Sequence, residues 1–235
     1  MELHPSLRGK RLERLQCAQQ IMTCMFKEFD SLCRKHDIKY WAIGGTLIGT
    51  VRKDKLSETG KNVGGWIPFD GDVDIAMMKT DYEKFKIVAY ELPSTMFLQN
   101  KQNDHRYLDS NCVKLRDKNS HYLSYTPAYA HHGLQIDIFL WDKFNEYVYY
   151  KQLSKNRYEE IYHRNVIFPL KEMDFEGFQI YVPNKYDEYC KINFGTWPLP
   201  YLPIEKRLPH EGDVCPDKPH PNDIVWYPHL YTNFK

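Results

Sequence analysis

Trp66-Ile67-Pro68-Phe69-Asp70-Gly71-Asp72-Val73-Asp74-Ile75-Ala76 is the stretch that decides how this chain is interpreted, because it places three carboxylates at the start of an apolar run. Successive side chains of a strand point to opposite faces, so Asp72 and Asp74 share one face and Val73 and Ile75 the other. Two like charges on a half-buried surface make each other costly to ionise. A hard divalent cation, Mg²⁺ or Mn²⁺, would offset them. The alternative is an acidic surface turn, which the flanking apolar residues disfavour.

Length and charge limit the classes of partner. The chain has 235 residues and a formal net charge of +1, so we expect one globular unit with no bulk attraction for nucleic acid or for an anionic membrane. No stretch approaches the roughly 18 apolar residues of a membrane span. The first ten residues lack the apolar core of a signal peptide. The expectation is therefore a cytoplasmic protein if Met1 is the natural start, and a lumenal one (Golgi or ER) if the chain is trimmed.

The six cysteines show no C-x-x-C spacing, which favours reduced thiols over a zinc ribbon or a disulfide framework. One loose group in the Pro-rich tail, His210, Cys215 and His220, could bind a metal, although a plain loop is the favoured interpretation.

A strand, a glycine turn and a helix are expected before the acids. Residues 40–43 form a short apolar run, Gly44-Gly45-Thr46 follow, and residues 47–52 have helical spacing. Glycine lets a backbone approach a phosphate closely, and the positive end of the following helix would add to the attraction. The alternative is an ordinary tight turn. Arg52 would extend toward the same anion or lie on the surface as a solvated arginine.

Two further strands carry charge. In residues 111–116 (NCVKLR), Lys114 and Arg116 alternate with apolar residues and share a face. Residues 133–141 (GLQIDIFLW) contain a single ionisable group, Asp137, and an acid in a central strand is costly unless it is paired or bound to a metal. We expect Asp137 to join Asp72 and Asp74, the alternative being a satisfied core carboxylate.

The remaining elements follow from periodicity and from turn residues. Past Pro198 the chain is rich in proline, which predicts an irregular wrap over the core. The expected elements are helices over 12–36, 82–92, 145–166 and 184–193, and a hairpin over 174–182.

Taken in order, these motifs resemble the LicD/fukutin family of nucleotidyltransferase-fold phosphotransferases. The resemblance covers about residues 32–199. It departs from the family pattern at Phe69, Gly71 and Lys53, where family members typically carry tryptophan, a fourth aspartate and histidine. The motifs that carry it are Gly44-Gly45, Arg52, residues 67–74, Lys114-Leu115-Arg116, Ile136-Asp137-Ile138-Phe139, Phe168-Pro169, residues 174–177, Val182-Pro183, residues 186–189 and residues 194–197.

The resemblance implies an α/β (α+β) chain with the polymerase-beta-like nucleotidyltransferase fold, a small mixed sheet flanked by helices. Residues 1–235 would form a single domain, with a core over about 32–199 and an irregular Pro-rich tail over 200–235.

The implied activity is transfer of a phospho-alcohol or phospho-sugar from a nucleotide-linked donor, such as CDP-choline or CDP-ribitol, to a glycan hydroxyl. Asp72 and Asp74 would hold Mg²⁺ or Mn²⁺, and Asp137 would complete the catalytic site as a ligand or as a base. The substrate-binding residues implied are Gly44, Gly45, Thr46, Arg52, Asp70, Lys114 and Arg116.

Two alternatives stay open on the sequence. A sugar-nucleotide glycosyltransferase with its own D-x-D site fits the acids but not the glycine turn or the distant Asp137. A non-catalytic family member that binds nucleotide or glycan is favoured only by Gly71.

Overall fold

A seven-stranded mixed sheet forms the centre of the molecule. The computed structural model describes residues 1–53, 55–57, 60–123, 131–152 and 157–231. Five strands lie in the order β1 (Tyr40–Ala42), β4 (Val73–Met78), β8 (Gln135–Phe144), β6 (Cys112–Asp117) and β5 (Met96–Gln99). The pair β4–β8 is parallel and the other pairs are antiparallel. The mixed α/β sheet expected from the sequence is confirmed.

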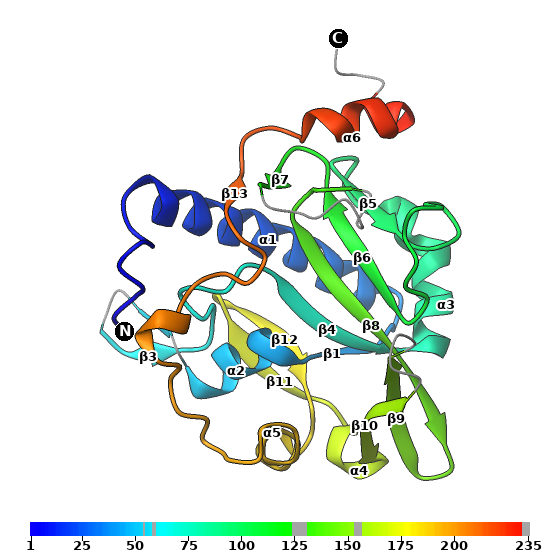
Figure 1. Cartoon of the computed structure of the whole chain (residues 1–235). Coiled ribbons are helices and arrows are strands. Elements are labelled where there is room, and N and C mark those ends of the chain that lie inside the picture. Colours follow the sequence, from blue (N-terminus) through cyan, green and yellow to red (C-terminus); the bar gives the residue numbers. More distant parts are fainter. Residues whose placement is uncertain (54, 58–59, 124–130, 153–156, 232–235) are drawn as a thin grey trace.

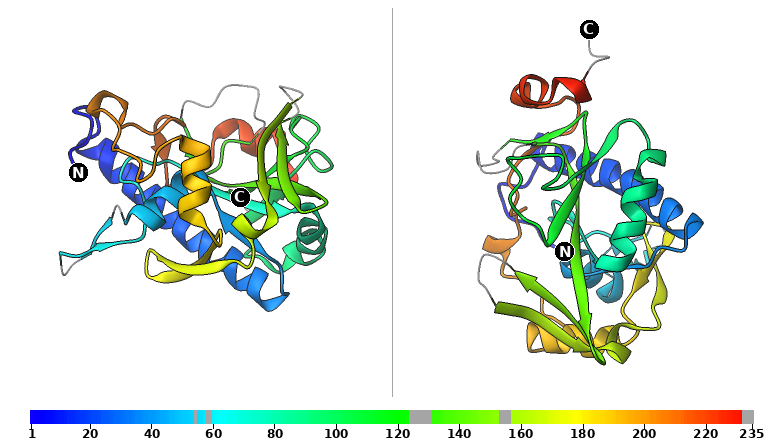
Figure 2. Two further views of the ribbon diagram at one scale, coloured as in Figure 1. Left: turned by 90° about the horizontal axis from the view of Figure 1, so that it is seen from below. Right: turned by 90° about the vertical axis from the view of Figure 1, so that its right-hand side faces the viewer.

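Two helices cover one face of this sheet (Figures 1 and 2). The apolar residues of α1 (Lys10–Lys35) recur every three or four positions, so they form one stripe that packs on the strands. The second helix is α3 (Lys79–Val88), and the two meet where the rings of Phe29 and Phe85 lie 5.1 Å apart.

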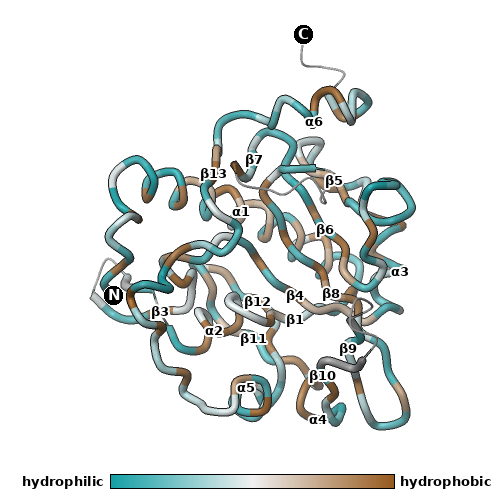
Figure 3. The backbone as a smooth tube through the Cα atoms, in the orientation of Figure 1, coloured by the Kyte–Doolittle hydropathy of each residue, from teal (hydrophilic) through white to brown (hydrophobic). Residues whose placement is uncertain are grey.

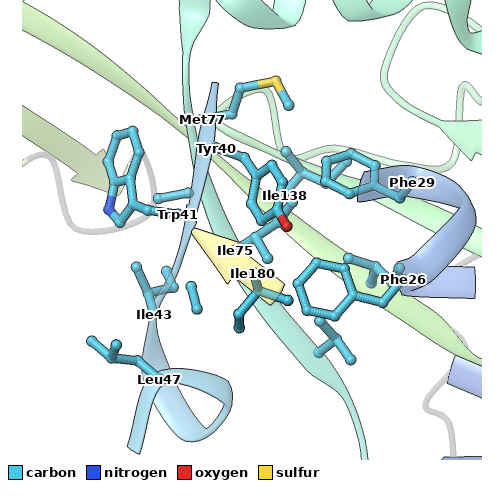
Figure 4. Packing of buried hydrophobic residues seen from close by; sticks show 14 of the residues in the cluster. Phe26, Phe29, Tyr40, Trp41, Ile43, Leu47, Ile75, Met77, Ile138 and Ile180 are labelled. Atoms are coloured by element: carbon cyan, nitrogen blue, oxygen red, sulfur yellow. The ribbon is translucent and has the colours of Figure 1, made fainter. Parts of the chain in front are cut away.

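Apolar side chains of the central strands point toward α1. Ile75 of β4 and Ile138 of β8 lie beside Phe26 and Phe29 (Figure 4). Hydrophobic and hydrophilic residues alternate along β6 and the first part of β8 (Figure 3). Because strand side chains alternate, Asp74 and Asp137 turn to the opposite face.

The helix expected over residues 145–166 is wrong. This segment forms β9 (Tyr147–Gln152), β10 (Arg157–His163) and α4 (Arg164–Ile167), and β9 also pairs with the end of β8. Tyrosine and valine suit strands, and Val148 and Tyr150 are both buried at strand spacing. The density of charge in this segment concealed that period.

Two of the expected helices and the expected hairpin agree with the structure. The structure has α1 and α5 (Tyr186–Phe194) close to the expected bounds, and the expected hairpin is β11 (Lys171–Phe175) with β12 (Phe178–Val182). The remaining elements are α2 (Gly44–Arg52), β2 (Lys55–Leu56), β3 (Asn62–Val63), β7 (His121–Tyr122), β13 (Val214–Cys215), α6 (Pro221–Trp226) and 3₁₀ turns at Ala89–Glu91, Ile204–Lys206 and Pro228–Leu230.

The tail beyond Pro198 is mostly irregular, as expected, and its strand β13 pairs with β7. It passes next to the start of β4, since Pro209 and Glu211 contact the space beside Gly71. The division into a core and a tail of one domain stays a prediction. In the part of the chain that the structure describes, no helix combines the length and apolar character needed to cross a membrane.

Candidate active site

Strand register brings the three predicted acids together. Asp74 of β4 is paired with Asp137 of the parallel neighbour β8. Asp72 directly precedes β4 and lies two residues before Asp74. Side chains two residues apart in an extended chain point to the same face, so Asp72 and Asp74 are expected to share one. One carboxylate oxygen from each of Asp72, Asp74 and Asp137 lies within 4.8 Å of the other two. These three oxygens form a donor set that suits a hard divalent cation.

Burial and mutual repulsion disfavour ionisation of these acids. Burial raises the pKa of Asp72 well above its ordinary value, and Asp74 and Glu211 raise it further. Burial, followed by Asp137 and Asp70, has the same effect on the pKa of Asp74. The pKa of Asp70 rises to about 7, chiefly through burial and then through Glu211. The site therefore has an excess of negative charge that a bound cation would offset.

A buried ion pair partly offsets this charge. Lys114 of β6 is paired with Asp137 in the strand register, and its Nζ donates to the two carboxylate oxygens of Asp137 over 2.7 and 2.6 Å. Gln135 Nε2 also donates to Asp137 Oδ2, over 3.2 Å. The fold thus brings Lys114 next to Asp137, and its predicted role in substrate binding stays a prediction.

The glycine turn lies against the acids. Gly44 has φ +53°, and a Cβ on it would overlap with Asp74 Oδ2, while a Cβ on Gly45 would overlap with Asp70 Oδ2. Only glycine leaves room for both carboxylates here. The adjacent Thr46 accepts a hydrogen bond of 2.9 Å from the backbone N–H of Asp74 through its Oγ1, and so it fixes the first turn of α2 to β4.

The two predicted arginines have other contacts. Arg52 lies at the far end of α2, about 12 Å along the helix axis from Gly44, where it donates to the Leu199 carbonyl over 3.1 Å and packs on the Tyr201 ring. Arg116 is fully buried and donates to Gln99 Oε1 and to the Gly133 carbonyl. Arg116 thus binds groups of β5 and of the segment before β8, and a direct role for either arginine stays a prediction.

The loose tail group of His210, Cys215 and His220 does not come together among the described residues. His210 lies with Asp72 and Glu211, whereas His220 lies with His132 and Asp223. The Cys215 thiol donates to Asp217 over 3.0 Å. Glu211 was missed by the sequence reasoning because it is a single acid in an irregular tail, distant in sequence from the other acids.

A mixed sheet with three clustered carboxylates at two adjacent strands, next to a glycine turn that opens a helix, is the arrangement expected of a nucleotidyltransferase-type domain. Residues 37–185 match the family model described as LicD/FKTN/FKRP, nucleotidyltransferase domain. The chain therefore belongs to this family.

Three curated relatives are similar to parts of the chain. An uncharacterized protein of Rickettsia prowazekii is 24% identical over 195 residues, which cover 81% of this chain and 61% of that protein. One of Rickettsia typhi is 28% identical over 163 residues, 68% of this chain and 40% of that protein. The lipopolysaccharide cholinephosphotransferase LicD of Haemophilus influenzae is 30% identical over 82 residues, 34% of this chain and 27% of that enzyme. The chain thus spans less than two thirds of each relative.

Proposed function

We propose that this chain is a phosphotransferase that depends on a divalent cation and moves a phospho-alcohol or phospho-sugar from a nucleotide-linked donor, of the CDP-alcohol type, to a glycan hydroxyl. The observation that supports this best is the pairing of Asp74 with Asp137 across β4 and β8, with an oxygen of Asp72 within 4.8 Å of both carboxylates. Family membership and the name of the Haemophilus relative agree with this chemistry.

Asp72, Asp74 and Asp137 would hold Mg²⁺ or Mn²⁺. Such an ion, when bound, neutralises the charge of a donor diphosphate and of the leaving nucleotide. The fit rests on the donor set, which consists of carboxylate oxygens close enough to share one ion, and on the excess negative charge of the site.

The chain's own residues would orient the donor. The first turn of α2 has backbone N–H groups that no helical carbonyl satisfies, so it attracts a phosphate. Gly44 and Gly45 allow that turn to lie directly against the acids, and Thr46 holds it there. The Lys114 ammonium, next to Asp137, would neutralise charge that develops on the phosphoryl oxygens.

Product analysis tests the proposal. The purified chain is incubated with Mg²⁺, a glycan acceptor and CDP-choline, CDP-ribitol or a set of nucleotide sugars, with Asp74→Asn as the matched inactive control. We expect CMP and a new phosphodiester from a CDP-alcohol, and none from the variant. Release of a nucleoside diphosphate with a new glycosidic bond would identify a glycosyltransferase instead. Tight donor binding without any product would identify a non-catalytic binding protein.

A further inference from the structure

Glu211 places a further carboxylate next to Asp70, Asp72 and Asp74. It comes from the irregular tail, beyond residues 37–185 that match the family model. A Cβ on Gly71 would overlap with Glu211 Oε2 and would also contact Pro209. The glycine between Asp70 and Asp72 therefore leaves the space that the Glu211 carboxylate fills.

One oxygen of the buried Glu211 carboxylate has no hydrogen-bond donor among the described residues. Its side chain is only 4% exposed. Oε2 accepts no hydrogen bond from any residue in the described part of the chain. Oε1 forms an ion pair with Nε2 of His210, whose side chain is 76% exposed. A buried carboxylate oxygen with no donor is costly, and native proteins generally pair such an atom or bind an ion to it.

The groups around the Glu211 carboxylate indicate that it would bind a cation. An oxygen of Glu211, an oxygen of Asp72 and a ring nitrogen of His210 all lie within 4.8 Å of one another. Glu211 also repels the carboxylates of Asp70, Asp72 and Asp74, since it contributes to the raised pKa of each. An acid held in an already negative site increases its affinity for a cation, because each further carboxylate adds to the attraction.

We infer that Glu211 is a ligand of a divalent cation bound at Asp72, so that the tail over residues 209–211 completes the cation site of the family domain. This inference rests on the proposed function, because it requires that the acids of β4 bind Mg²⁺ or Mn²⁺. It assigns the tail a binding role that the match to the family model does not cover. It also accounts for the absence of a side chain at Gly71, where a larger residue would displace Glu211.

Mn²⁺ binding to the full chain tests the inference without any need for a substrate. Free Mn²⁺ is followed by electron paramagnetic resonance during titration of the wild type, Glu211→Gln, Glu211→Asp and Asp72→Asn. Glu205→Gln is the matched control, because Glu205 is an exposed acid of the same tail. We expect Glu211→Gln to weaken Mn²⁺ binding about tenfold or to remove one bound ion. Glu211→Asp should have a smaller effect, and Glu205→Gln none.

The outcomes separate the inference from the proposed function. Wild-type affinity and stoichiometry in Glu211→Gln, with binding lost in Asp72→Asn, would overturn the role of Glu211 and leave the cation site standing. No Mn²⁺ binding by the wild type, or full binding by both variants, would overturn both proposals. If Glu211→Gln does not fold, Glu211→Asp decides: wild-type affinity in that variant overturns the inference, and weaker binding supports it.

Discussion

Replacing Asp74 by asparagine should change the stability of the protein in opposite directions with and without a divalent cation. Two unit charges 4.8 Å apart, the limit for the clustered carboxylate oxygens, repel each other by about 3 kcal/mol at an effective dielectric constant of about 20. Asp74 faces Asp137 and Asp72, while Lys114 offsets part of the repulsion. We therefore expect Asp74→Asn in EDTA to be more stable than the wild type by about 1–3 kcal/mol, which corresponds to about 2–12 °C in Tm for a chain of this size.

Mn²⁺ should reverse that order. A cation that binds only the folded protein, at a concentration of about 100 times its Kd, raises the free energy of unfolding by about 2.7 kcal/mol. Asp74→Asn should lose most of this gain. Differential scanning fluorimetry at pH 7.5, with EDTA or with Mn²⁺, measures both effects. Asp37→Asn, at an exposed acid between α1 and β1, is the control and should respond to Mn²⁺ as the wild type does. A lower Tm of Asp74→Asn in EDTA, or a full Mn²⁺ shift in that variant, would refute the reasoning.

Three further predictions follow from individual contacts. Lys114→Met leaves the carboxylate of Asp137 buried without its ion-pair partner, so urea unfolding in EDTA should show a loss of stability of about 3–5 kcal/mol. The double variant with Asp137→Leu should recover part of this loss, and equal losses in the two variants would contradict a buried ion pair. Gly45→Ala places a methyl group against Asp70, so calorimetry should show weaker Mn²⁺ and CDP-choline binding, and unchanged affinities would argue against this close approach. Burial lowers the pKa of His131 to about 3, so below the ordinary pKa of about 6.5 the unfolded chain binds a proton at His131 that the folded chain does not. The free energy of unfolding should therefore fall as the pH falls from about 6.5 toward about 3, by about 2 kcal/mol at pH 5. His131→Gln should lose less stability than the wild type between pH 7 and pH 5, and an equal loss in the two proteins would refute this.

Part of the candidate site could be predicted from the sequence, because it depends only on local backbone geometry. The spacing of Asp72 and Asp74 in an apolar run was enough to predict a shared strand face, because alternation is a property of the backbone itself. The same kind of reasoning located α1 and the turn at Gly44 and Gly45. It failed over residues 145–166, where charged residues hid a strand period and only pairing with β8 reveals it.

Long-range packing decided the rest. The neighbour of Asp74 is Asp137 because β8 pairs in parallel with β4, and the neighbour of Asp137 is Lys114 because β6 pairs with β8 on the other side. Strand order and register depend on how the whole apolar surface is buried, which no single segment specifies. The contact between Glu211 and Gly71 could not be predicted from the sequence at all, since an irregular tail has no periodicity that indicates its path. The sequence thus determined which acids share a strand face, and the tertiary structure determined which other charges surround them.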